Sequence, residues 1–143
     1  MSNALEVTDS DFETQIENHK GLAVVDFWAT WCAPCRAEMP SIERLSGSLK
    51  GQPFVVLGIN VGESARVARD YAEKLPISFT VLLDRDTRTA KGWGARVLPA
   101  SYLVGPDGTI RYSYYGDLDW SSATVRARIE ELMPRDKTRA AQQ

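Results

Sequence analysis

The sequence predicts one α/β domain, with a central mixed β-sheet flanked by helices on both faces. Three observations support this fold class. The length of 143 residues fits a single domain. Strand and helix patterns alternate along most of the chain, which favours parallel strand pairing. The last two strands flank a tight turn, which adds an antiparallel pair.

Short apolar runs bounded by turn residues predict the strands. The first run is interrupted only by Asp26, as is typical of a strand that is buried on both faces. Residues 105–108, Gly-Pro-Asp-Gly, form a hairpin turn between the last two strands. The predicted strands are residues 22–29, 54–59, 79–83, 100–104 and 109–115.

Apolar residues spaced three and four apart predict the helices. Met39, Ile42 and Leu45 follow this spacing, and Pro40 among them is expected to kink the helix. Ser121 or Ser122 can cap the last helix. The predicted helices are residues 11–18, 33–49, 63–75 and 121–133, with a short helix or turn at 86–93.

Only the ends of the chain lack a pattern. We expect a flexible N-terminus at residues 1–6, a domain at 7–134 and a flexible tail at 135–143. A net charge of −2 does not favour nucleic acid as a partner. No apolar run reaches the ~18 residues of a membrane span. We expect a monomer.

The motif Cys32-Ala33-Pro34-Cys35 follows a predicted buried strand and opens a helix. This spacing and context are typical of a redox dithiol, because the two sulfurs can bond across the first helical turn. The helix N-terminus stabilises a thiolate on Cys32, so we expect Cys32 to attack a substrate disulfide. Cys35 lies one turn inside and is expected to resolve the mixed disulfide. Pro34 suits the first turn because its missing N–H is not needed there.

Two other interpretations of the cysteines stay open, a pair of structural thiols and a metal site. His19 is the only histidine and lies in a polar stretch, so a zinc site would need carboxylate ligands. The sequence contains neither G-x-G-x-x-G nor G-x-x-x-x-G-K-[ST]. We therefore expect no metal, nucleotide or flavin cofactor, and a Cys32–Cys35 disulfide as the redox group.

The chain resembles thioredoxin-fold disulfide oxidoreductases from about residue 8 to residue 133. Residues 7–29 resemble cytosolic thioredoxins. The later segments resemble the TlpA/ResA-type proteins of the bacterial cell envelope. The matching segments are residues 28–32, 35–40, 60–64, 81–84, 98–104 and 106–108. The resemblance implies a thioredoxin fold and a bacterial enzyme that reduces protein disulfides.

Two acids match catalytic positions of these families. Asp26 matches the buried carboxylate of thioredoxins and would accept a proton from Cys35. TlpA-type proteins usually lack this acid, and the alternative is a strand aspartate that only finds a hydrogen-bond partner. Glu38 matches a TlpA/ResA glutamate that could tune the thiols, and the alternative is a solvated helix residue.

The resemblance also implies a substrate groove. Pro99 matches the cis-proline that faces the dithiol, which would turn the backbone of Leu98 outward to pair with an extended substrate. Gly116 matches a glycine that lets a peptide approach closely. The expected substrate-binding residues are Trp31, Ala33, Pro34, Leu98, Pro99 and Gly116.

A separate electron donor must reduce the disulfide again. The TlpA/ResA resemblance implies a membrane thiol carrier and slightly favours the periplasm or cell envelope, with a signal absent or removed. If Met1 is the native start, the cytoplasm fits better. If the thioredoxin-like segment at residues 7–29 is the better guide, the donor is thioredoxin reductase. Two alternative functions stay open, a copper carrier that uses both thiolates and a thiol peroxidase with Thr30 near the cysteine.

Overall fold

The computed structural model describes residues 4–6, 21–75 and 77–134 of the chain. Its strands form one six-stranded sheet in the order β1-β4-β3-β2-β5-β6. The pairs β1–β4, β4–β3 and β3–β2 are parallel, whereas β2–β5 and β5–β6 are antiparallel. The sheet is therefore mixed, as predicted. The strands are β1 (Ala4–Glu6), β2 (Leu22–Trp28), β3 (Phe54–Val61), β4 (Thr80–Asp84), β5 (Ala100–Val104) and β6 (Ile110–Tyr115).

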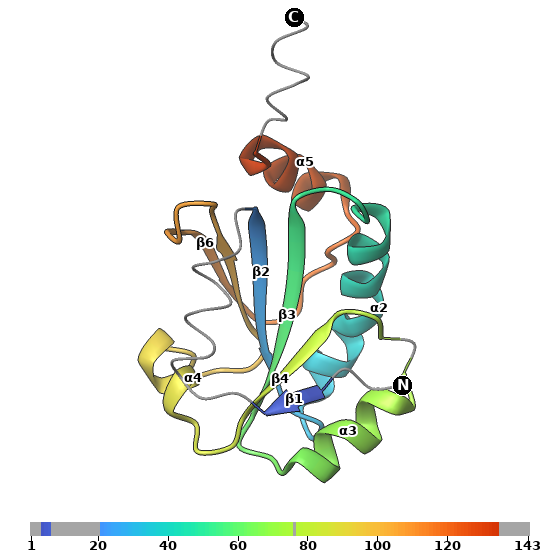
Figure 1. The fold of residues 1–143 in the computed structure, drawn as a ribbon, viewed down its shortest axis with the longest axis vertical. Coiled ribbons are helices and arrows are strands. Elements are labelled where there is room, and N and C mark those ends of the chain that lie inside the picture. Colours follow the sequence, from blue (N-terminus) through green and yellow to red (C-terminus); the bar gives the residue numbers. More distant parts are fainter. Residues whose placement is uncertain (1–3, 7–20, 76, 135–143) are drawn as a thin grey trace, which may run out of the picture.

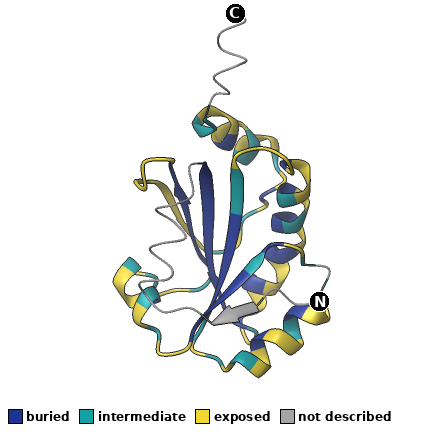
Figure 2. Cartoon of the chain, viewed as in Figure 1, coloured by how far each residue is buried: buried dark blue, intermediate teal, exposed yellow. Residues whose placement is uncertain are grey.

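The helices lie on the outside of this sheet, and the central strands between them are buried (Figures 1 and 2). Ser64 and Ser122 cap α3 and α5 by accepting hydrogen bonds from N–H groups of the first turn. The helices are α2 (Ala33–Ser48), α3 (Ala65–Glu73), α4 (Arg88–Trp93) and α5 (Ala123–Leu132). The predicted helix at 11–18 and the tail at 135–143 lie outside the described residues.

The element order differs from the prediction at the N-terminus. We expected residues 1–6 to be flexible, but Ala4–Glu6 form β1, which pairs in parallel with β4. The physical reason is that the stability of a three-residue edge strand comes from its partner. That partner is more than seventy residues away in the sequence, so no local pattern predicts the strand.

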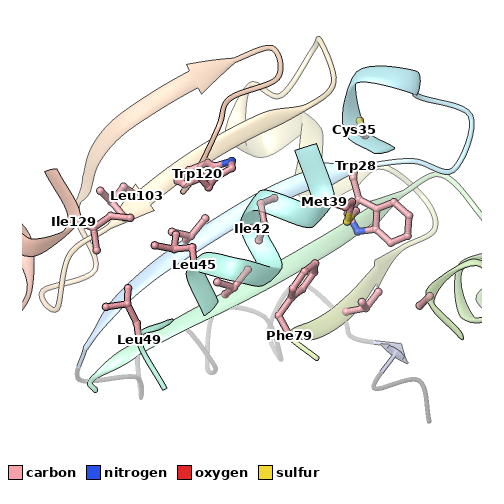
Figure 3. Packing of buried hydrophobic residues seen from close by; sticks show 14 of the residues in the cluster. Trp28, Cys35, Met39, Ile42, Leu45, Leu49, Phe79, Leu103, Trp120 and Ile129 are labelled. Carbon is pink, nitrogen blue, oxygen red and sulfur yellow. The ribbon is translucent and has the colours of Figure 1, made fainter. Parts of the chain in front are cut away.

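α2 packs along the face of the sheet that carries the larger buried cluster (Figure 3). Met39, Ile42 and Leu45 are buried there, as their spacing predicts. Pro40 lies inside the helix, where it cannot donate the usual bond to the carbonyl of Arg36. On β2, alternate residues face this cluster, and Asp26 lies between two of them, Val24 and Trp28. Asp26 therefore points to the side of the sheet that α2 covers.

Candidate functional site

The two cysteines lie at the junction of β2 and α2. Cys32 is the N-cap residue of α2, and its sulfur accepts a hydrogen bond from the N–H of Cys35 at 3.2 Å. The structure shows the two sulfurs bonded to each other, with their Cα atoms 5.2 Å apart. Once the bond is reduced, a thiolate on Cys32 faces the same N–H and the positive end of the helix dipole. The predicted position of the motif is confirmed.

Exposure distinguishes the two cysteines. Cys35 is fully buried and Cys32 is 4% exposed, so Cys32 is the one closer to solvent. Trp31 beside it is 71% exposed, and Ala33 and Pro34 are exposed as well. The indole ring of Trp31 and the first turn of α2 therefore form the surface around Cys32. A large exposed aromatic side chain of this kind is available for contact with a partner.

Glu63 fixes the loop that leads to Cys32. It accepts hydrogen bonds from the Thr30 N–H at 2.7 Å and from the Thr30 hydroxyl at 2.6 Å. The Asn60 side-chain amide donates to Glu63 at 2.9 Å. Sequence reasoning did not assign this role to Glu63. The signal was present, because residues 60–64 are among the segments that resemble TlpA/ResA-type proteins.

The predicted proline loop is joined to the end of β6. The Leu98–Pro99 peptide bond is cis, as the resemblance implied. The Gly116 N–H donates to the Pro99 carbonyl at 2.9 Å. Gly116 has a φ of +112°, which L side chains rarely adopt, and open space lies where a side chain would begin. Leu98 packs against the buried cluster that contains Cys32 and Cys35.

Both predicted acids are buried between β2 and α2. Asp26 is 0% exposed and accepts a hydrogen bond from the Ser101 hydroxyl at 2.8 Å. Glu38 is 2% exposed and accepts one from the Leu118 N–H at 3.0 Å. Glu38 lies three residues after Cys35, on the same buried face of α2. Glu38 is therefore not a solvated helix residue.

The environment of these acids favours their protonated forms. Burial raises the pKa of Asp26 to about 6, although hydrogen bonds from Glu38 and Ser101 act against the shift. Burial, together with the negative charge of neighbouring Asp26, raises the pKa of Glu38 to about 10, although hydrogen bonds from Leu118 and Trp120 act against the shift. Each carboxyl thus changes the proton affinity of the other.

The described residues contain no group of three or more His, Cys, Asp and Glu that could hold a metal ion. His19, the only histidine in the sequence, lies outside the residues that the structure describes. Among the described helices, none is long and apolar enough to cross a membrane.

A buried disulfide that caps a helix beside a mixed sheet defines this protein as a thioredoxin-fold thiol–disulfide oxidoreductase. The AhpC/TSA family matches residues 3–113, and the chain belongs to that family. The chain is 27% identical over 123 residues to the thiol-disulfide oxidoreductase ResA of Geobacillus thermodenitrificans. That match covers 85% of this chain and 70% of the relative.

Solved structures agree with this class. The dsbF protein of Mycobacterium tuberculosis, in mixed oxidised and reduced forms, has a TM-score of 0.70 at 25% identity and covers 79% of this chain and 81% of its own. StoA of Bacillus subtilis has a TM-score of 0.67 at 20% identity over 79% of this chain and 83% of its own, and supports the fold alone. The relatives favour disulfide exchange over a metal carrier or a peroxidase.

Proposed function

We propose that the protein reduces disulfides in protein substrates and that Cys32 makes the attack. The position of Cys32 as the N-cap residue of α2 carries this proposal. The Cys35 N–H and the helix dipole stabilise its thiolate, and only the thiolate is nucleophilic. Cys35 is fully buried and has no direct access to a substrate.

The reaction proceeds in two exchanges. The Cys32 thiolate attacks one sulfur of the substrate disulfide, and the other sulfur leaves as a thiolate. Cys35 then loses its proton and attacks the Cys32 sulfur. The Cys32–Cys35 bond forms, the bond from Cys32 to the substrate breaks, and the substrate leaves reduced. Asp26 and Glu38 are the buried carboxyls that we assign to take up the proton of Cys35.

The surface around Cys32 suits an extended protein segment. Trp31, Ala33 and Pro34 are exposed beside it. The open space at Gly116 lets a backbone approach closely. We place the backbone of Leu98 opposite the substrate strand, with Pro99 holding the loop. The supporting observation is that the Gly116 N–H donates a hydrogen bond to the Pro99 carbonyl. This bond holds the two proposed substrate-binding residues side by side.

The electron donor is a separate protein. The similarity to ResA supports a membrane thiol carrier as the donor, and thioredoxin reductase is the donor to compare it with. Reduction of the oxidised protein by each candidate, followed through its tryptophan fluorescence, separates the two.

The direction of the reaction is tested by the reduction potential of the Cys32–Cys35 pair in glutathione or dithiothreitol buffers. A value near that of thioredoxin, about −270 mV, supports a reductant. A value near −120 mV, about that of a strong oxidant, overturns the direction and leaves the exchange chemistry in place. The Cys32→Ser variant is the control, because it has no pair to oxidise.

A further inference from the structure

The two buried acids present a hydrogen-bonding problem. Ser101 satisfies Oδ1 of Asp26, and the Leu118 N–H satisfies Oε2 of Glu38. The remaining oxygens, Asp26 Oδ2 and Glu38 Oε1, are buried and accept no hydrogen bond, and the buried indole N–H of Trp120 beside Glu38 also has no partner. A buried carboxylate oxygen without a donor costs about 1–3 kcal/mol or more. Two ionised carboxylates side by side would carry this cost twice and would also repel each other.

A single shared proton resolves the problem. The two carboxyls are close enough for each to shift the pKa of the other, and a hydrogen bond between two carboxyls requires a proton on one of them. Ser101 and the Leu118 N–H occupy the other two oxygens, which leaves Asp26 Oδ2 and Glu38 Oε1 for the shared proton, with the Trp120 indole N–H as a further donor to Glu38. This arrangement gives both unpartnered oxygens a hydrogen bond and leaves one negative charge on the two carboxyls in place of two.

The groups that set the proton affinity of the pair are the two carboxyls themselves, Ser101 on β5, and the Leu118 and Trp120 segment before α5. Cys35 lies one turn before Glu38 on the same buried face of α2. Ser101, Leu118 and Trp120 also line a largely apolar cavity of about 200 Å³. The other titratable or charged residues on its wall are Tyr112, Tyr114 and Arg128.

We propose that Asp26 and Glu38 form a proton-sharing carboxyl pair, which acts as one unit to accept the proton of Cys35. This inference rests on the proposed function. Before release, the pair holds one proton and one negative charge. Cys35 transfers its thiol proton to the pair, which becomes neutral, and the Cys35 thiolate attacks the Cys32 sulfur. The substrate sulfur leaves with the electrons of the broken bond and is protonated. The carboxyl pair then returns its extra proton.

Carboxyl carbon NMR of the oxidised protein tests the sharing without any need for activity. We expect two titration steps, near pH 6 and near pH 10, each visible at both Asp26 Cγ and Glu38 Cδ. Asp26→Asn and Glu38→Gln should each abolish one step. Ser101→Ala should move the lower step upward, because it removes a donor to ionised Asp26. Glu73→Gln, at an exposed position of α3, is the control. Independent single steps at the two carbons would overturn the sharing.

The catalytic part is tested on a mixed disulfide between Cys32 and a coloured aromatic thiol, whose release by Cys35 is followed by absorbance. We expect Asp26→Asn and Glu38→Gln each to slow release by about 100-fold. The double variant should be no slower than the slower single variant, because both remove the same unit. Multiplied effects would overturn the single unit. If wild-type protein releases no thiol, the proposed function fails, whereas the NMR result still decides the sharing.

Discussion

Glu63 accepts two hydrogen bonds from Thr30, one from its backbone N–H and one from its hydroxyl. Thr30 lies two residues before Cys32, and Glu63 lies beyond the end of β3. A single carboxylate therefore ties the cysteine loop to the neighbouring strand. The bond from Asn60 fixes the carboxylate in turn, so the loop is held from outside its own segment.

Glu63→Ala should destabilise the protein and slow the attack by Cys32. The change removes three hydrogen bonds to a carboxylate and leaves the buried amide of Asn60 without this acceptor. Hydrogen bonds to charged groups contribute about 1.5–3 kcal/mol each, and these are partly exposed, so we expect a loss of about 2–3 kcal/mol in the free energy of unfolding. Urea denaturation measures it, with Glu73→Ala as the exposed control. Equal stability of the two variants would contradict the role of Glu63.

Cys35→Ser should trap a mixed disulfide between Cys32 and a substrate peptide. The attack needs only the thiolate of Cys32, whereas release needs the sulfur of Cys35. Cys32→Ser should trap little, because Cys35 is fully buried. Mass spectrometry of each variant after incubation with a disulfide peptide gives the answer. Trapping through Cys35 instead would reverse the two roles.

Local sequence patterns predicted the features that depend on neighbouring residues. The apolar run of β2 and the helical spacing after Cys32 placed the dithiol at a helix N-terminus, and the structure confirms this. The features that sequence reasoning missed depend on contacts between distant segments. β1 is stabilised by pairing with β4, and the contact of Glu63 with Thr30 spans thirty-three residues.

The interaction of Asp26 with Glu38 shows the same limit. Each acid matches a position of a different family, and neither resemblance places the two acids together. Their contact depends on the packing of α2 against β2, which sets Glu38 on the buried face of the helix above Asp26. Residue type and spacing identify candidates, whereas tertiary packing decides which candidates act on one another.

Gly116→Ala should destabilise the protein, although there is room for the added methyl group. The φ of +112° is unfavourable for any L side chain, so we expect a loss of about 1–2 kcal/mol. Gly47→Ala is the matched control, because Gly47 lies inside α2 with equally open space and should gain about 0.5–1 kcal/mol. Thermal or urea unfolding compares the two. A stabilised Gly116→Ala variant would show that its backbone is not constrained.

Raising the pH should weaken the folded state through Asp26 and Glu38. Their folded pKa values, about 6 and about 10, lie above their ordinary values of 3.8 and 4.5, so the folded protein binds more protons than the unfolded chain. The stability that they contribute is fully present below about pH 4 and is lost as the pH rises toward 10. Between pH 7 and pH 9 the free energy of unfolding should fall by at most about 1.4 kcal/mol per pH unit. Glu38→Gln removes the group that titrates in this range, so its urea-denaturation curves should depend less on pH. Parallel pH profiles for wild type and variant would show that Glu38 is already ionised at pH 7.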